Sequence, residues 1–194
     1  SIRHYPDATA ATEAVAGAMG VDPGRLLLTN GGAEAIALVA GALPTGRVDQ
    51  PEFSLYARHL RRLDHRGPRW RSNPNNPTGR LAAPDERAAV WDEAFYPLAT
   101  GTWTRGDAGA FVVGSLTKLW ACPGLRLGYV LAPDPTHIES LAARQPEWSV
   151  NGLALAVVPD LLEQTDLPGW ARVAATLRDD LVALLAAHGL DADP

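Results

Sequence analysis

Short apolar runs alternate along this chain with longer segments of helical periodicity. Three runs, LLLTN (26–30), GAFVVGS (109–115) and GLRLGYVLAP (124–133), are apolar and bounded by turn residues, which predicts strands. Apolar positions spaced three and four apart predict helices. The predicted helices span residues 8–19, 33–43, 135–144, much of 148–164, and 167–189.

The middle of the chain is richer in turn residues. Residues 51–63 (PEFSLYARHLRRL) predict a turn followed by a helix, and NPNNPTG (73–79) predicts an elaborate turn. PDERAAVW (84–91) predicts the start of a helix that runs into a short strand ending near Asp92. Helices that alternate with short apolar strands predict an α/β fold with a mostly parallel sheet.

Composition narrows the class of protein. The 194 residues are 46% hydrophobic and 20% charged, which is typical of a globular chain, and the net charge of −5 disfavours a nucleic-acid partner. The single cysteine, Cys122, excludes an intrachain disulfide and a cysteine-based metal cluster. No run of eighteen apolar residues predicts a membrane span, and the first residues do not resemble a signal peptide, so we expect a cytoplasmic location.

Lys118 is the only lysine in the chain, whereas sixteen residues are arginine. Chance in an arginine-rich sequence is one explanation, and a lysine at the end of a strand is ordinarily a solvated charge. The other explanation is chemical, because an ammonium can lose its proton and attack a carbonyl, which a guanidinium cannot do. The residues around Lys118 are uncharged, and we expect an apolar pocket that favours the neutral amine.

Three further patterns are ambiguous when each is taken alone. The strand 26–30 runs through Gly31–Gly32 into a helix, a layout that aims backbone N–H groups at an anion, and NPNNPTG is by itself only a turn. Asp92, in WDEAF, ends a predicted strand and is followed by Glu93, and paired acids are usually at the surface. At a sheet edge, however, a carboxylate could hold a protonated ring nitrogen.

SNPNNPTG, WDEAF and SLTKLWACPGLRLGY, in this order, resemble the fold-type I pyridoxal-phosphate enzymes of the class I/II aminotransferase group. The resemblance runs from Tyr5 to about residue 190 and implies a three-layer α/β sandwich with a mostly parallel central sheet. SLTKLWACPGLRLGY and RQPEWSVNGLA are most similar to L-threonine-O-3-phosphate decarboxylases of cobalamin biosynthesis. Histidinol-phosphate aminotransferases come next, with similar YPD and NPNNPTG segments.

The resemblance implies a role for each motif. Lys118 would form a Schiff base with the aldehyde of pyridoxal 5′-phosphate and then move protons, Asp92 would pair with the pyridine nitrogen, and Asn76 would bind the phenolic oxygen. The phosphate would be held by Ser115, Arg126 and the Gly32–Ala33 backbone. Phe53 would stack on the ring, and Tyr5 would reach the phosphate of the neighbouring subunit in a homodimer. Phe95 stands where many aminotransferases carry a tyrosine, which favours the decarboxylases.

The chain also departs from the family pattern. It is short between Tyr56 and Asn73 and again between Gly79 and Asp92, and no arginine matches the motif that grips the substrate carboxylate in the C-terminal part. We therefore expect an apparently truncated fold, with a reduced cofactor-binding domain at 1–147. An interdomain helix and the start of an incomplete small domain would follow at 148–194. Omitted segments of an ordinary enzyme and a naturally reduced protein remain alternative explanations.

The preferred functional prediction is a pyridoxal-phosphate enzyme acting on a phosphorylated amino acid or amino alcohol, with no nucleic-acid or membrane partner. Decarboxylation of threonine phosphate is preferred over transamination of histidinol phosphate. Two alternatives come from other classes: a cofactor-binding or assembly protein with little turnover, and an α/β domain that binds no cofactor.

Overall fold

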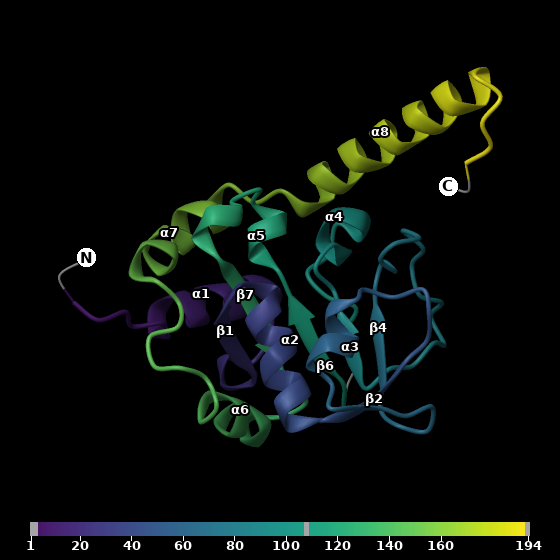
Figure 1. Ribbon diagram of the computed structural model, residues 1–194. Coiled ribbons are helices and arrows are strands. Elements are labelled where there is room, and N and C mark those ends of the chain that lie inside the picture. The colour runs from purple at the N-terminus through teal and green to yellow at the C-terminus, as the bar shows by residue number, and fades with distance from the viewer. Residues whose placement is uncertain (1–3, 107–108, 193–194) are drawn as a thin grey trace.

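The computed structural model describes residues 4–106 and 109–192, and seven strands and eight helices can be followed through them (Figure 1). The strands are β1 (Leu26–Asn30), β2 (Thr45–Val48), β3 (Arg62–Leu63), β4 (Arg69–Ser72), β5 (Val90–Asp92), β6 (Phe111–Gly114) and β7 (Leu127–Leu131). The helices are α1 (Thr9–Met19), α2 (Gly31–Ala42), α3 (Leu55–His59), α4 (Tyr96–Thr100), α5 (Leu116–Leu119), α6 (Pro135–Ala142), α7 (Gly152–Glu163) and α8 (Leu167–Ala187).

The strands form one sheet in the order β1-β7-β6-β5-β4-β2-β3. Five strands are mutually parallel: β3, β2, β4, β5 and β6. Strand β7 runs antiparallel to both of its neighbours, β6 and β1. Because β4, β5 and β6 are parallel neighbours, their carboxyl ends lie at one edge of the sheet, where ligands bind in open α/β folds. The predicted α/β class with a mostly parallel sheet is confirmed.

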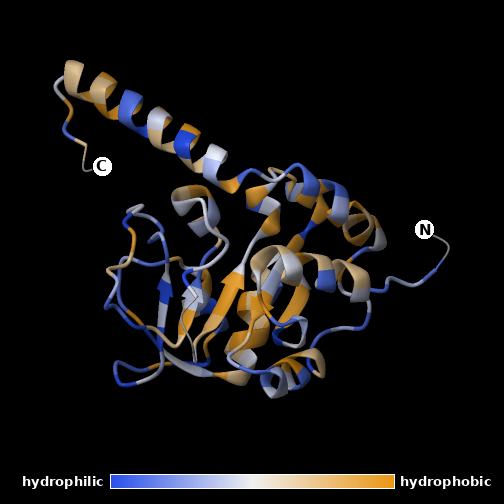
Figure 2. Ribbon diagram, turned by 180° about the vertical axis from the view of Figure 1, so that it is seen from behind, coloured by the Kyte–Doolittle hydropathy of each residue, from blue (hydrophilic) through white to orange (hydrophobic). Residues whose placement is uncertain are grey.

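Two layers of helices cover the sheet, so the fold is a three-layer sandwich (Figure 1). Side chains of α1, α5 and α7 pack on one face and those of α2, α3 and α6 on the other. Neighbouring strand residues divide between the faces: Val112 joins the first cluster, whereas Phe111 and Val113 join the second. The central strands are accordingly the most hydrophobic part of the ribbon in Figure 2.

The middle of the chain differs from the sequence prediction. The helix predicted at 51–63 is only the five-residue α3, since the chain then turns into the edge strand β3. No helix forms in PDERAAVW, because Glu86 there lies in ion pairs with Arg69 and Arg71 of β4, and the segment crosses to β5 as turns. Three parallel strands, β2, β3 and β4, were not predicted, so the sheet extends further than the apolar runs indicate.

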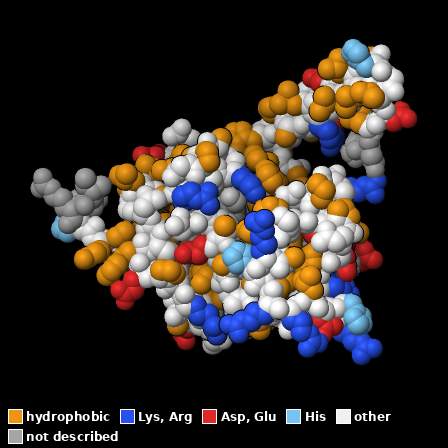
Figure 3. Space-filling view, in the orientation of Figure 1, with side chains coloured by type: hydrophobic (Ala, Val, Ile, Leu, Met, Phe, Trp, Pro, Cys, Tyr) orange, Lys and Arg blue, Asp and Glu red, His pale blue; other side chains and the backbone are white. Residues whose placement is uncertain are grey.

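The first part of helix α8 packs against α4, and the rest of the helix projects away from the sandwich (Figure 1). Only Leu167, at its first position, is buried, and hydrophobic side chains are exposed along the rest of the helix (Figure 3). Val173, Leu177, Leu181 and Leu184 are all more than half exposed. Among the described residues, no helix combines the length and the apolar character needed to cross a membrane.

Candidate active site

A small cavity opens at the carboxyl ends of β4 and β5, beside α5. It collects side chains from four separate segments of the chain and includes an acid, an amide, an amine and two aromatic rings. Its lining residues are Phe53, Ser72, Pro74, Asn76, Asp92, Ala94, Phe95 and Lys118. Four of the residues predicted to bind the cofactor, Phe53, Asn76, Asp92 and Lys118, are thus brought together here, from positions up to 65 residues apart.

Asp92 is the buried acid of this cavity. Its carboxylate accepts hydrogen bonds from the Tyr56 hydroxyl at 2.8 Å and from the Ala94 backbone N–H at 3.0 Å. Burial raises the pKa of Asp92 above its ordinary value, while the bond from Tyr56, the Ala94 N–H and the charge of Lys118 act in the opposite direction. A buried carboxylate with a raised pKa is stabilised by a cationic partner in the cavity, which suits a protonated ring nitrogen.

Tyr56 is a site residue that the sequence analysis missed. It lies on α3, three residues after Phe53 of the preceding loop, and its side chain is fully buried. Burial, and then the charge of Asp92, raise the pKa of Tyr56, so the hydroxyl stays protonated and donates to the acid. No local pattern marks Tyr56 as a site residue, because Phe53 lies outside the helix and the partner Asp92 is 36 residues further along the chain.

Lys118 extends from the one-turn helix α5, directly after β6. Its Nζ lies 4.5 Å from the ring centroid of Phe95 and 5.8 Å from that of Phe53. The neighbouring Thr117 fixes the turn, because its hydroxyl donates to Leu127 O at 2.9 Å and accepts from Leu127 N at 3.0 Å. Lys118 itself is exposed, so the expectation that it is buried in an apolar pocket is wrong. Its apolar neighbours Leu116 and Leu119 face the core instead.

Arg126, Ser115 and the two glycines that open α2 form a second cluster. The Arg126 guanidinium covers the Cα of Gly31, where any Cβ would collide with it, and Gly31 has a left-handed φ of +76°. A Cβ on Gly32 would lie 3.6 Å from the Cβ of Ser115. This cluster joins a guanidinium, a hydroxyl and the amino-terminal end of a twelve-residue helix, a combination that suits an anion.

Gly128 of β7 allows this cluster to close. A Cβ at Gly128 would lie 2.5 Å from Gly31 C, 2.6 Å from Gly32 N and 2.9 Å from Gly114 O, all of them backbone atoms. Only glycine fits where β7 passes the start of α2, so the GLRLGY motif has a steric requirement as well as a chemical one.

The turn 73–79 presents Asn76 to the cavity. Asn73 and Asn75 hold the turn itself: Asn73 Oδ1 accepts from Ala82 N at 2.9 Å, and Asn75 Oδ1 accepts from the Thr78 hydroxyl at 2.7 Å. The Asn76 backbone N–H donates to Ser72 Oγ at 2.8 Å. In the part of the chain that the structure describes, the side-chain amide of Asn76 makes no hydrogen bond, which leaves it available to a ligand.

Two predicted residues lie outside these contacts. Ala33 is exposed in the first turn of α2. Tyr5 is 75% exposed and stacks on Trp148, with ring centroids 4.2 Å apart and an angle of 19° between the ring planes. It does not line the cavity that contains Lys118, and its contact with a neighbouring subunit stays a prediction.

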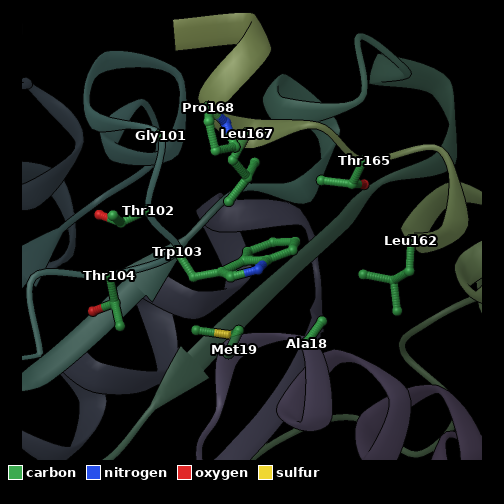
Figure 4. A pocket seen from close by; sticks show the side chains of 10 residues that line it. All are labelled: Ala18, Met19, Gly101, Thr102, Trp103, Thr104, Leu162, Thr165, Leu167 and Pro168. Atoms are coloured by element: carbon green, nitrogen blue, oxygen red, sulfur yellow. The ribbon is translucent and has the colours of Figure 1, made fainter.

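A larger hollow lies at the base of α8, between α1, the segment after α4 and the end of α7 (Figure 4). The indole of Trp103 extends across it, above Met19. The described residues that line it are apolar or carry hydroxyls, and they include no acid, base or amine. It offers no group for acid–base chemistry, in contrast to the cavity at Lys118.

Comparison with known proteins identifies the family. Residues 70–192 match the family described as aminotransferase class I and II, which covers more than half of the chain. The chain belongs to this family. The resemblance predicted from the motifs is therefore confirmed, and the Lys118 cavity lies in the part of the fold where this aminotransferase-family chain carries its most specific motifs.

Two curated relatives illustrate the range of the similarity. The threonine-phosphate decarboxylase of Salmonella typhimurium is 30% identical over 200 residues, which cover 79% of this chain and 55% of the relative. Histidinol-phosphate aminotransferase 2 of Methylococcus capsulatus is 28% identical over 215 residues, which cover 83% of this chain and 58% of the relative. The chain thus spans a little over half the length of these relatives.

Solved structures show the same fold. The L-threonine-O-3-phosphate decarboxylase from Porphyromonas gingivalis superposes with a TM-score of 0.80 and 26% identity, covering 95% of this chain and 68% of that one. The histidinol-phosphate aminotransferase from Sinorhizobium meliloti, solved in complex with pyridoxal-5′-phosphate, superposes with a TM-score of 0.84 at 17% identity. It covers 99% of this chain and 65% of that one.

Proposed function

We propose that this chain binds pyridoxal 5′-phosphate between Asp92, Lys118 and Arg126 and acts as a pyridoxal-phosphate enzyme on a phosphorylated amino acid. Decarboxylation of threonine phosphate is the preferred reaction. The observation that supports this most directly is the composition of one cavity. A buried acid, the only lysine of the chain and an unbonded asparagine amide line it together.

The residues present fit this cofactor. Asp92, buried and held by Tyr56, would pair with the ring nitrogen, and Asn76 would donate its side-chain amide to the phenolic oxygen. Phe53 would cover one face of the ring. Arg126, Ser115 and the start of α2 would hold the phosphate, because they join a planar cation to the positive end of a helix dipole. When bound, the cofactor supplies an aldehyde carbon and an electron-withdrawing ring for reactions at an amino-acid α-carbon.

Each of the chain's residues at the site would have a separate chemical role. Lys118 Nζ would hold the aldehyde carbon until an amino substrate displaces it, and the freed amine would then carry a proton to or from the substrate α-carbon. Asp92 would keep a proton on the ring nitrogen. Phe95 and Phe53 flank the amine and would exclude water from one side of it.

Transamination of histidinol phosphate is the second candidate, since the Methylococcus relative covers more of this chain than the Salmonella one does. Three expectations stay predictions: a homodimer in which Tyr5 reaches the neighbouring phosphate, a cytoplasmic location, and the division of the chain. The division is into a cofactor-binding domain at 1–147 and an interdomain helix with the start of an incomplete small domain at 148–194. A cofactor-binding protein with little turnover also remains, because no arginine matches the motif that grips the substrate carboxylate.

Borohydride reduction after incubation with the cofactor tests the core of the proposal. Since Lys118 is the only lysine, the mass of one reduced cofactor should appear on the peptide that contains it, and the visible absorbance band should vanish on reduction. Lys118→Arg keeps the positive charge but has no amine that can attack the aldehyde, so it is the matched control and should show neither signal.

Reaction type follows from the products. With O-phosphothreonine we expect carbon dioxide release, whereas a keto product from histidinol phosphate would favour the second candidate. Cofactor capture without either product would support the binding protein. Equal spectra for the wild type and Lys118→Arg would refute the proposal as a whole.

A further inference from the structure

Glu52 is a buried carboxylate just outside the cavity. It directly precedes Phe53 in the loop between β2 and α3, and its side chain is only 1% exposed. A carboxylate is costly to bury unless several donors surround it. Its contacts therefore indicate what it does.

The carboxylate of Glu52 takes most of its hydrogen bonds from Ser72, at the end of β4. The Ser72 hydroxyl donates to Oε2 at 2.5 Å, and the Ser72 backbone N–H lies 3.1 Å and 3.2 Å from the two oxygens. The Arg71 guanidinium adds a contact at 3.2 Å. A serine hydroxyl has one proton, and because that proton is given to Glu52, the lone pairs of Ser72 Oγ are left to accept.

Ser72 Oγ in turn accepts the backbone N–H of Asn76 at 2.8 Å. Glu52 is thus connected through one hydroxyl to Asn76 on one wall of the cavity, and through the chain to Phe53 on another. A second link joins the same segments, since Asn75 Nδ2 donates to Pro51 O at 3.0 Å. Ser72 also faces Asp92 in the register of β4 and β5.

The need to balance the charge of Arg71 does not explain why the Glu52 carboxylate is buried here. Arg71 already donates to Glu86 at 3.0 Å, and Glu86 makes no contact with Ser72. The contact that Glu52 alone provides is the one to Ser72.

We propose that Glu52 is a positioning residue for the cofactor ring, acting through the Ser72 hydroxyl to fix the separation of Phe53 and Asn76. This inference rests on the proposed function, since the ring that these two residues would hold is that of pyridoxal phosphate. In Glu52→Gln, an amide NH₂ replaces one acceptor oxygen and faces the donors of Ser72 and Arg71. Ser72 then loses the partner that orients its hydroxyl.

The test measures the dissociation constant of pyridoxal phosphate by fluorescence titration, and the visible circular dichroism per bound cofactor at saturation. The dichroism reports the orientation of the ring, which a change in fold stability alone does not alter. We expect Glu52→Gln and Ser72→Ala each to weaken binding roughly tenfold, the order of a lost hydrogen bond to a charged group, and to change the dichroism. The double variant should bind the cofactor no more weakly than either single variant, because Glu52 and Ser72 act through the same hydroxyl.

Glu86→Gln is the matched control, since it removes the other carboxylate on Arg71 and leaves Ser72 untouched; it should bind as the wild type does. Should Glu52→Gln not fold, Ser72→Thr against Ser72→Ala decides, because threonine keeps the hydroxyl and should keep the affinity. Wild-type affinity and dichroism in Glu52→Gln would overturn the inference. Additive losses in the double variant, or an equal loss in Glu86→Gln, would also overturn it. A wild-type protein that captures no cofactor would instead refute the proposed function itself.

Discussion

Replacing Asp92 by asparagine should stabilise the cofactor-free protein relative to the wild type, by an amount that grows as the pH rises. Burial raises the pKa of Asp92 above 3.8, whereas an aspartate in the unfolded chain titrates near its ordinary value. Between these two pKa values the folded state binds more protons than the unfolded state, so the free energy of unfolding falls as the pH rises through that window. Asparagine has the same shape and does not ionise, so the variant avoids this loss.

The magnitude follows from linkage. A single group that is protonated in the folded state and ionised in the unfolded state changes the free energy of unfolding by about 1.4 kcal/mol per pH unit, and this is the largest slope that Asp92 can supply. The hydrogen bonds from Tyr56 and Ala94 both have a partner on an amide, since a hydroxyl can accept as well as donate. The variant therefore differs from the wild type mainly in its pH dependence.

Urea unfolding of the cofactor-free protein, followed by tryptophan fluorescence at a series of pH values from 3 upward, measures the difference between variant and wild type. Subtraction removes the contribution of all other titrating groups. Asp134→Asn is the control of opposite sign. Hydrogen bonds from Thr136 and His137 lower the pKa of Asp134 to about 2, so its contribution to stability is present above 3.8 and lost as the pH falls through 2.

A difference between Asp92→Asn and wild type that stays constant above pH 4, or that falls as the pH rises, would refute the reasoning. The same substitution removes the acid proposed to hold the ring nitrogen. Added pyridoxal phosphate should consequently stabilise the variant less than the wild type.

Two further predictions concern the walls of the site. Gly128→Ala should lower the free energy of unfolding by about 1–3 kcal/mol, because the nearest atoms to its Cβ are backbone atoms of Gly31, Gly32 and Gly114. Gly124→Ala is the control, since no atom lies within 4 Å of its Cβ. Equal stabilities of the two variants in chemical denaturation would contradict the steric argument. Tyr56→Phe removes a hydrogen-bond donor to the buried Asp92, so it should raise the pKa of Asp92 further and weaken cofactor binding, which fluorescence titration measures. Tyr96→Phe, at the start of α4, is the control and should bind the cofactor normally. Unchanged affinity in Tyr56→Phe would exclude a role for Tyr56 in holding Asp92.

Sequence alone located several groups that line the cavity but not the groups that hold them. Lys118, Asp92 and Asn76 were predicted from motifs that resemble a known family, and the parallel strands bring all three side chains to one cavity. Glu52 and Tyr56 were not, since their partners Ser72 and Asp92 lie 20 and 36 residues further along the chain, and no local pattern records that pairing. The exposure of Lys118 was missed for the same reason: its neighbours in sequence are apolar, but they face the core.

Turn chemistry also outweighed local helix propensity in the middle of the chain. PDERAAVW has the composition of a helix start, yet Glu86 is drawn to the arginines of β4. Because β4 and β5 are parallel neighbours, the chain must return from the carboxyl end of β4 at Ser72 to the amino end of β5 at Val90. It does so without a helix. Such a requirement comes from topology, which propensity does not encode.

The pairing of β1 with β7 has a consequence for synthesis on the ribosome. Leu26 lies opposite Leu131, and the strands between them in the sequence make up the rest of the sheet. A nascent chain can therefore assemble β2 to β6 while β1 waits without a neighbour, and the Gly31–Gly128 contact closes only after β7 has emerged. We therefore expect β1 to be the last of the seven described strands to join the sheet.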